Sequence, residues 1–506
     1  MRAYKRVLPW LALIAALIIY FVFYYSHIAH ILDSDMSSEL VLGRLLASEH
    51  RIVTNSWFYS TEIRILDTNI IYGLLFIFAN SFATVRLLAA PLMILIFCMS
   101  FYYMCRSLKL REYYPYLMSL ILLPFTVDYI YVYLMGFYYI FHAAIVFMCI
   151  GLLASKAKKG LLYVLALVAG ASGLRLLVIL FVPLLIIAIV SWVKKNFTST
   201  NRAMLIASFF ALVGYGINCL LALYISFRQF GRLRLEVPSI GKLRDIGVCF
   251  ITSLGYRKSN PSYLVIVIAL IIYLVALYRM RANTRLKEDG FALIYVKIFV
   301  IALALEVLIF AFTNMDMLSR YFLQVMLMAV VFIAYAHKYL IASHKVAGIL
   351  LIVVFVLWVP NTFISYRDMA KRDTVSRYEP IVEYIEANGF CYGYSEFWDG
   401  NIITELTDGQ VDMYTFSFLK EDLIRDNHDI YRWLQLTSHQ DTRPAGPVFV
   451  LVSKQDTKHI IFFEKLKLRE ADYETSDYLL YTFESVDELE AYIDETDVGE
   501  NTKDEL

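Results

Sequence analysis

The stretch that decides the fold is Val7–Tyr25, VLPWLALIAALIIYFVFYY, whose 19 residues include no charged side chain. A helix of about 20 apolar residues crosses the ~30 Å hydrocarbon core of a bilayer. Basic residues precede the stretch, and no small-x-small cleavage site follows it. The stretch therefore predicts an uncleaved membrane-spanning helix.

The rest of the chain has the same apolar character. Apolar residues make up 59% of the 506 residues and charged residues 18%, with a mean hydropathy of +0.60. Soluble domains average about 45–50% apolar and about 25% charged residues. The excess comes in long blocks, and such blocks are helices in lipid. We expect a polytopic α-helical membrane protein with about eleven transmembrane helices: Val7–Tyr25, Arg86–Cys105, Tyr113–Tyr131, Met135–Ala154, Gly160–Ser172, Leu174–Val193, Arg202–Tyr224, Tyr263–Tyr278, Phe291–Phe312, Tyr321–Ala336 and Val346–Ile364.

One pair of predicted spans allows two interpretations. Gly160–Ser172 and Leu174–Val193 are separated by a single residue. They are either two helices or one long broken helix, and in the second case every later segment changes sides of the membrane.

The basic residues of the short loops set the orientation, because such residues concentrate on the cytoplasmic side. An odd number of spans places the N-terminus in the cytoplasm and the C-terminus outside. The predicted domains are a transmembrane domain over residues 1–365 and a small extracytoplasmic α/β domain over residues 366–506. With eleven spans, the basic residues that alternate loops carry all lie on the N-terminal side: Arg2, Lys5, Arg6, Arg106, Lys109, Arg111, Lys156, Lys158, Lys159, Lys194, Lys195, Arg279, Arg281, Arg285, Lys287, Lys338 and Lys345.

The predicted location is a bacterial plasma membrane. The chain ends in Lys503-Asp504-Glu505-Leu506, which matches an endoplasmic-reticulum retrieval signal. The tail from Ser485 is acidic throughout, so chance also explains this match. The N-glycosylation sequon at Asn196 falls on the predicted cytoplasmic side.

The first outer loop, residues 26–85, is too long for a plain connector. Its apolar spacing predicts a helix in the membrane interface over Met36–Ser48. A second interfacial or re-entrant helix is expected over Ile70–Ala79, which is too short to span.

An acidic motif precedes the first of these helices. It consists of Asp33, Ser34 and Asp35, and Glu39 lies one turn after Asp35 on the same helix face. Taken alone, the motif is explained equally well as a polar helix N-cap. Further along the loop, Glu62 and Arg64 follow an aromatic stretch.

This order of features resembles the GT-C membrane glycosyltransferases, and most closely the protein O-mannosyltransferases and the bacterial aminoarabinose transferases that modify lipid A. The resemblance covers the N-terminal part of the chain through the second predicted span. Four stretches carry it: Asp33-Ser34-Asp35, LLASEHRIV at Leu45–Val53, Tyr59-Ser60-Thr61-Glu62 and Val85-Arg86-Leu87.

The resemblance implies transfer of a sugar from a polyprenyl phosphate to an acceptor on the outer face. It implies Asp33 or Asp35 as the base that takes the acceptor proton, and Glu62 as a residue that orients the acceptor or the base. The family usually has Asp-Glu or Glu-x-Asp in place of Asp-Ser-Asp, so the sequence leaves open which aspartate is the base. The Lys-Pro that follows the second acidic residue in aminoarabinose transferases is replaced by Ile63-Arg64.

The lipid-phosphate leaving group of this reaction needs positive charge or a metal. Arg175 and the basic outer loop 226–261 are candidates for this positive charge. Each also has a structural explanation. Arg175 can snorkel at a helix end, and a long loop can cross the membrane regardless of its charge. Asp33 and Asp35 can hold a divalent metal, but no cofactor is certain. The substrate-binding candidates lie at the outer face: Glu39, Arg64, Arg175, Arg232, Arg234 and Arg320.

The C-terminal domain has no Gly-rich phosphate loop, no catalytic-triad signature and no Cys/His cluster. Glu396, Trp398 and Asp399 can bind a glycan, or Phe397 and Trp398 are simply core. Alternating elements suggest a small α/β domain: helix Ser376–Ala387, strand Phe390–Tyr394, helix Asp399–Leu406, strand Val411–Phe416, strand Val448–Val452, helix Thr457–Leu466, strand Tyr478–Phe483 and helix Val486–Ile493.

The expected function is an inverting glycosyltransferase whose partners are a polyprenyl-phosphate sugar, an extracytoplasmic glycan, lipid or protein acceptor, and membrane lipids. Nucleic acid is not an expected partner. Two alternatives remain. A transporter or flippase of lipid-linked sugars would have internal repeats or broken helices at the midplane. A non-catalytic protein of the same fold would bind a glycan.

Overall fold

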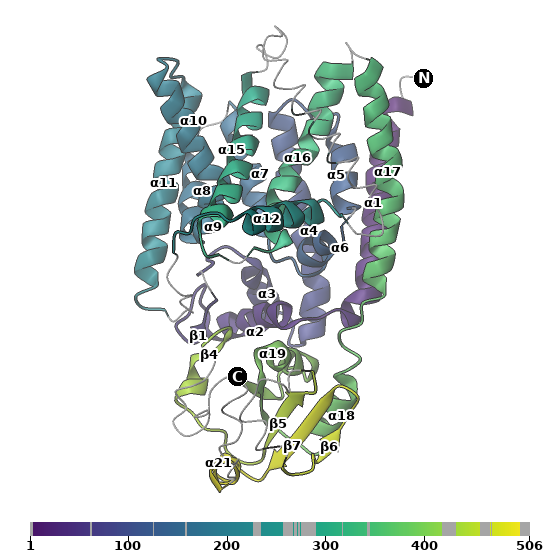
Figure 1. The fold of residues 1–506 in the computed structure, drawn as a ribbon, viewed down its shortest axis with the longest axis vertical. Coiled ribbons are helices and arrows are strands. Elements are labelled where there is room, and N and C mark those ends of the chain that lie inside the picture. The colour runs from purple at the N-terminus through teal and green to yellow at the C-terminus, as the bar shows by residue number, and fades with distance from the viewer. Residues whose placement is uncertain are drawn as a thin grey trace.

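A bundle of long helices carries a small sheet domain at one end (Figure 1). Among the residues that the structure describes, six helices are long and apolar enough to cross a membrane: Val7–His30, Phe82–Ser107, Leu174–Val193, Ser199–Leu221, Gly290–Phe312 and Ser319–Tyr339. The computed structural model describes residues 4–60, 63–124, 126–156, 159–225, 234–256, 290–315, 317–341, 345–416, 432–455 and 468–495, with Val267, Ile271, Leu274 and Leu466.

Helices lie in most of the predicted spans, but eleven membrane-spanning helices are not shown, because Ile140–Ala154 and Gly160–Ala171 are shorter than the six helices above. The predicted span Tyr263–Tyr278 lies almost wholly outside the described residues. In chain order the bundle contains α1 (Tyr4–His27), α4 (Phe82–Ser107), α5 (Tyr114–Leu122), α6 (Val127–Tyr129), α7 (Ile140–Ala154), α8 (Gly160–Ala171), α9 (Leu174–Leu176), α10 (Val182–Val193), α11 (Ser199–Leu221), α15 (Gly290–Phe312), α16 (Leu323–Ala336) and α17 (Lys345–Ala370).

Two neighbouring predicted spans differ from the structure. The helix expected over Met135–Ala154 begins only at Ile140, because Met135 ends a π-helical turn. Tyr113–Tyr131 was expected as a single helix, but α5 ends at Leu122 and the segment Val127–Met135 is bent by 96° from it. Pro124 explains the break, because proline has no backbone N–H and disfavours the helical conformation of the residue before it. Thr126 then caps the next helix by accepting a hydrogen bond from the Tyr129 N–H.

The pair of spans with two interpretations forms two helices. Gly173, whose φ is 114°, separates α8 from the helix that begins at Leu174. α8 packs tightly on α11, because a Cβ at Gly214 would lie 2.0 Å from the Leu167 carbonyl oxygen. Small residues permit such close approach between membrane helices.

Two helices form a layer across one end of the bundle (Figure 1). They are α2 (Ser34–Glu49) and α3 (Thr68–Phe76), which lie where the sequence predicted interfacial helices. Asp33 caps α2 and Asp67 caps α3 through their side-chain oxygens. This layer separates the bundle from the C-terminal domain.

A third helix, α12 (Ile240–Ser253), lies across the front of the bundle (Figure 1). Ile246 and Phe250 pack on the outer end of α15. Its exposed face carries Ile240 and Leu243. Only part of the predicted basic loop 226–261 is described.

The C-terminal domain is built on a five-stranded sheet of order β3-β2-β5-β7-β6. β2 runs parallel to β3 and β5, whereas β7 runs antiparallel to β5 and β6. A separate two-stranded pairing joins β1 of the first loop to β4 of this domain. The bounds are β1 (Trp57–Phe58), α18 (Glu379–Ala387), β2 (Tyr392–Glu396), α19 (Phe397–Leu406), β3 (Asp412–Phe416), β4 (Gln435–Leu436), β5 (Val448–Ser453), β6 (Tyr473–Glu474), β7 (Tyr478–Phe483) and α21 (Val486–Glu495).

Alternation along β5 supplies two cores, one on each face of this sheet. Val450 packs with Leu489 of α21, and Phe449 packs with Ile381 and Ile402 of α18 and α19. The predicted strands and helices of this domain are confirmed, except the helix Thr457–Leu466, of which only the last residue is described.

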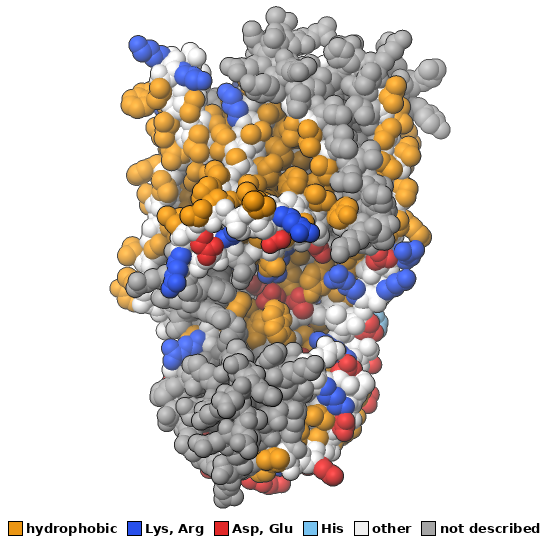
Figure 2. Space-filling model, viewed as in Figure 1, with side chains coloured by type: hydrophobic (Ala, Val, Ile, Leu, Met, Phe, Trp, Pro, Cys, Tyr) orange, Lys and Arg blue, Asp and Glu red, His pale blue; other side chains and the backbone are white. Residues whose placement is uncertain are grey.

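The C-terminal ends of α1 and α17 lie at the same end of the bundle as the sheet domain (Figure 1). Phe23 and Tyr366 meet there edge to face, with ring centroids 4.7 Å apart. Figure 2 shows an apolar surface over the upper part of the bundle, with charged side chains at its upper end, along α12 and on the sheet domain. This distribution is that of a helical membrane protein.

Candidate active site

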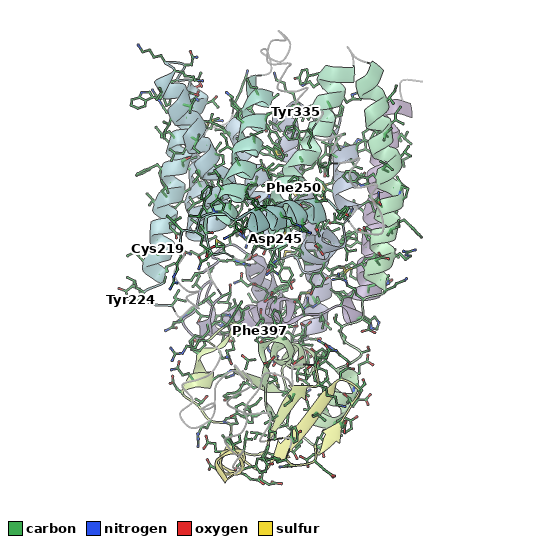
Figure 3. The ribbon with its side chains drawn as sticks, viewed as in Figure 1. Cys219, Tyr224, Asp245, Phe250, Tyr335 and Phe397 are labelled. Carbon is green, nitrogen blue, oxygen red and sulfur yellow. The ribbon has the colours of Figure 1, made fainter. Side chains whose placement is uncertain are left out.

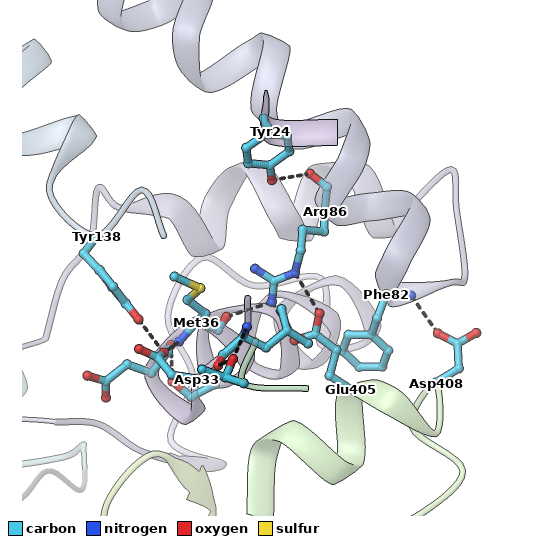
Figure 4. Close-up of polar contacts among 12 residues, drawn as sticks. Tyr24, Asp33, Met36, Phe82, Arg86, Tyr138, Glu405 and Asp408 are labelled. Atoms are coloured by element: carbon cyan, nitrogen blue, oxygen red, sulfur yellow. Dashed lines mark hydrogen bonds and ion pairs between the residues drawn. The ribbon is translucent and has the colours of Figure 1, made fainter. Parts of the chain in front are cut away.

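Asp33 shapes the beginning of α2. Its Oδ1 accepts hydrogen bonds from the Met36 N–H at 2.7 Å and from the Tyr138 hydroxyl at 2.5 Å, and its Oδ2 accepts one from the Tyr131 hydroxyl. The bond to Tyr138 is drawn in Figure 4. Both oxygens of Asp33 are therefore engaged in holding α2 against the segment Tyr131–Tyr138.

Asp35 lies in the first turn of α2 and is half-buried. Enclosure by protein and the neighbouring Asp33 carboxylate raise the pKa of Asp35 to about 6, although Arg320 and Arg64 oppose the shift. Asp35 therefore changes charge near neutral pH, which suits a general base.

Glu39 follows Asp35 by one helical turn and accepts a hydrogen bond from the Thr68 hydroxyl at 3.2 Å. Burial and the nearby Asp67 raise the pKa of Glu39 to about 8. Glu39 is therefore mostly neutral at pH 7. Burial also raises the pKa of Asp67, which forms an ion pair with Arg64 at 3.0 Å.

Three arginines converge on two tyrosine rings beside these carboxylates. The Arg175 guanidinium lies 4.1 Å from the ring centroid of Tyr139 and 5.1 Å from that of Tyr321. Arg64 lies 6.0 Å from the Tyr139 ring, and Arg320 lies 5.9 Å from the Tyr321 ring. The three come from the first loop, α9 and the turn before α16, so the fold gathers distant segments into one basic cluster.

The structure brings together Asp33, Asp35, Glu39 and these arginines, all of which the sequence singled out. Glu62 and Arg232 lie outside the described residues. Arg234 is exposed, and its backbone pairs with Asn314 after α15. None of the described contacts of Arg234 joins it to the basic cluster.

A metal at Asp33 and Asp35 finds little support in the geometry. Within the described residues, no group of three or more His, Cys, Asp or Glu side chains is placed to hold a metal ion. Asp33 already uses both oxygens for hydrogen bonds. The His27 ring stacks on Phe23 and its Nδ1 lies 2.9 Å from the Phe23 carbonyl oxygen.

Sequence reasoning missed the tyrosines of the site. Tyr131, Tyr138 and Tyr139 belong to the stretch Asp128–Tyr139, DYIYVYLMGFYY, which was divided between two predicted spans. Part of it forms a π-helical turn, Ile130–Met135. Such turns are frequent at functional sites, but the signal available in the sequence was only the density of tyrosines after Pro124.

The C-terminal candidates for glycan binding differ in exposure: Glu396 is half-buried, Asp399 is buried and Trp398 is exposed. Asp399 is buried and accepts hydrogen bonds from the hydroxyls of Tyr378 and Tyr478 at 2.6 and 2.8 Å. Phe397 is buried as core and lies at the top of this domain (Figure 3). Trp398 is 58% exposed, so its assignment to the core is wrong.

The two acidic side chains of α2 at the site keep some contact with solvent. Figure 2 shows acidic side chains in a recess between α12 and the C-terminal domain. Asp35 and Glu39 both keep partial exposure despite their enclosed positions. The arrangement of an accessible carboxylate beside clustered arginines suits proton removal next to a bound anion.

No family model matches this chain, and no curated protein shows significant similarity to it.

Proposed function

We propose that the chain is an inverting glycosyltransferase of the GT-C type, which moves a sugar from a polyprenyl phosphate to an acceptor on the outer face of a bacterial plasma membrane. The single observation that carries the proposal is the half-buried Asp35, which lies within the electrostatic reach of Arg320 and Arg64. A base and a phosphate site are the two parts that this transfer requires.

In the proposed reaction, the acceptor hydroxyl oxygen attacks the anomeric carbon and forms the new glycosidic bond. The bond between that carbon and the phosphate oxygen breaks, and its electron pair leaves with the polyprenyl phosphate. The acceptor proton passes to the Asp35 carboxylate. Configuration inverts because a single displacement takes place.

The surroundings of the two aspartates favour Asp35 over Asp33 as the base. Asp33 accepts hydrogen bonds from the Met36 N–H and from two tyrosine hydroxyls, which occupy three of the roughly four lone-pair sites of its carboxylate and fix its orientation. A base needs a free lone pair within reach of the acceptor proton. Asp33 then serves to position the first turn of α2.

The arginine cluster is the proposed site of the lipid phosphate. Arg64, Arg175 and Arg320 present guanidinium groups, which pair with phosphate oxygens through several N–H donors. Tyr139 and Tyr321 hold these groups in place through their ring faces. Glu39, neutral at pH 7, adds no charge that would repel the donor.

The topology proposed with this function has eleven spans, an N-terminus in the cytoplasm and an extracytoplasmic C-terminal domain. Support comes from α1 and α17, whose outer ends lie at one end of the bundle (Figure 1). The chain enters α1 at the end of the bundle away from the sheet domain and leaves α17 at the end beside it (Figure 1). A chain that begins on one side of a membrane and leaves its last span on the other side crosses an odd number of times.

The test uses the purified full-length protein with a panel of radiolabelled polyprenyl-phosphate sugars and an envelope-glycan extract as acceptor. The expected result is release of label from one donor class. If no donor releases label but labelled lipid moves across sealed proteoliposomes, the protein is a transporter. If donors bind without release or movement, it is a non-catalytic binding protein.

A further inference from the structure

The C-terminal domain is joined directly to the helix that carries the site. The Ser34 hydroxyl, between the two aspartates of the motif, donates a hydrogen bond to the Phe397 carbonyl at the beginning of α19. The Thr374 hydroxyl bonds to Leu32 on the other side of the motif, donating to its carbonyl at 2.6 Å. The segment after α17 and the beginning of α19 therefore both hold the beginning of α2.

A buried ion pair joins the same domain to the transmembrane bundle (Figure 4). Arg86 lies in the first turns of α4 and Glu405 in the last turn of α19, and both are more than nine-tenths buried. The Arg86 Nε and Nη2 atoms donate to the two Glu405 oxygens at 2.7 and 2.5 Å. This two-pronged geometry fixes the plane of the guanidinium.

The same guanidinium reaches α2. Arg86 Nη2 also donates to the Met36 carbonyl at 3.4 Å, one residue after Asp35 (Figure 4). The Tyr24 hydroxyl of α1 donates to the Arg86 carbonyl at 3.3 Å. Arg86 therefore contacts the first turn of α2, the first span and α19 of the C-terminal domain.

We propose that Glu405 is a positioning residue of the site: it orients Arg86, and Arg86 in turn holds the first turn of α2, so that the C-terminal domain sets the position of Asp35. The role in catalysis rests on the proposed function, whereas the effect on α2 does not. The carbonyl of Met36 is the physical link, because Asp35 shares a peptide bond with the residue that Arg86 holds.

Two variants test this link, with a matched control. Glu405→Gln removes the charge that orients Arg86. Arg86→Lys keeps the charge and an ion pair with Glu405 but loses the planar fork, so it tests the link even if Glu405→Gln does not fold. The control is Glu386→Gln, the same change at an exposed position of α18 in the same domain.

The first readout is backbone hydrogen exchange in a peptide that covers residues 34–40. We expect roughly tenfold faster exchange in both variants and no change in the control, because a weakened anchor opens the first turn of α2 more often. Unchanged exchange in this peptide in a folded Arg86→Lys or Glu405→Gln protein would overturn the proposal and leave the pair a simple docking contact.

The second readout is steady-state transfer. We expect kcat to fall by about 10- to 100-fold while the donor KM stays within about twofold, because a displaced base slows the chemical step without touching the arginine cluster. Equal loss through KM alone would contradict the positioning role. If the wild-type protein transfers no sugar but the variants still change hydrogen exchange in residues 34–40, the proposed function is overturned and the structural link remains.

Discussion

At the scale of single residues, Asp33 and Asp35 lie two positions apart but have different surroundings. Two tyrosine hydroxyls and a backbone N–H hold Asp33, whereas the Asp35 carboxylate is half-buried and feels the charges of Arg320 and Arg64. The difference arises from helix geometry, since a capping residue turns its side chain back onto the helix. The two residues therefore give separate experimental signatures.

The pH dependence of transfer is the first signature. With the pKa of Asp35 at about 6, the base gains its proton as pH falls through 6, so kcat/KM should drop there. With the pKa of Glu39 at about 8, ionisation above pH 8 adds a negative charge beside the base and the donor phosphate, so activity should fall again. The profile should be bell-shaped with a maximum near pH 7.

Glu39→Gln separates the two limbs of this profile, because glutamine imitates the neutral acid. The variant should keep the acid limb and lose the alkaline limb. An alkaline limb that persists unchanged in Glu39→Gln would assign that limb to another group.

Stability is the second signature. Asp33→Ala removes a helix cap and leaves the Tyr138 hydroxyl without its acceptor, so the free energy of unfolding should fall by about 2–4 kcal/mol. Asp35→Asn should change it by less than about 0.5 kcal/mol, a typical value away from caps and cores. Chemical denaturation in detergent micelles, followed by tryptophan fluorescence, measures both. Equal losses in the two variants would contradict the division of roles.

The arginine cluster predicts a third effect. Arg175→Lys keeps a positive charge but loses the planar group that stacks between Tyr139 and Tyr321. A hydrogen bond to a charged group contributes about 1.5–3 kcal/mol, so the donor KM should rise by roughly 10- to 100-fold with a smaller change in kcat. Donor titration of the initial rate gives both constants. A normal KM would show that the phosphate binds elsewhere.

How much of the site could be predicted depends on the residue type. Asp35, Glu39 and Arg175 stood out because charges near apolar spans are costly and therefore informative. Asp67 and Tyr138 did not, because aspartate before a helix and tyrosine at a span end are common for local reasons. The ion pair of Arg86 with Glu405 joins residues 319 positions apart, and no local pattern encodes it.

At the scale of elements, the apolar blocks predicted the helices of the bundle, because the length of each apolar block can be read directly from the sequence. Alternation likewise predicted β7 over Tyr478–Phe483 with its observed bounds. The bend after Leu122 was missed, although Pro124 provides its signal. The strands β1 and β4 were missed because each is two residues long and forms only against the other.

The contact between α8 and α11 gives a prediction at this scale. Gly214→Ala would place a Cβ 2.0 Å from the Leu167 carbonyl oxygen, whereas a Cβ at Gly216 on the same helix meets no atom within 4 Å. Gly214→Ala should therefore lower the unfolding temperature in detergent by several degrees, as overpacking costs about 1–3 kcal/mol. Gly216→Ala is the control and should leave it unchanged. A normal unfolding temperature for Gly214→Ala would contradict this packing.

At the scale of the whole molecule, the α2–α3 layer lies between two bodies of different character. The bundle above it is apolar, and the domain below it carries charged surface (Figure 2). The buried pair of Arg86 and Glu405 joins α4 of the bundle to α19 of the domain, beside the first turn of α2. Removal of one partner of such a pair typically costs about 3–5 kcal/mol, so the two bodies are expected to unfold together.

The proposed topology is tested by the native cysteine Cys391, which is exposed in the C-terminal domain. A membrane-impermeant maleimide should label Cys391 in intact bacterial cells, and Cys391→Ser should abolish that label. Labelling that appears only after lysis would place this domain in the cytoplasm and reverse the orientation.

The most direct measurement of the central claim is single-turnover transfer from the donor that the panel identifies, with wild type beside Asp35→Asn and Asp33→Asn at pH 7. Asp35→Asn is expected to bind the donor normally and to slow transfer by about 10²- to 10⁴-fold. Asp33→Asn, which can still cap α2, is expected to keep most of the rate. Equal transfer by wild type and Asp35→Asn would contradict the account.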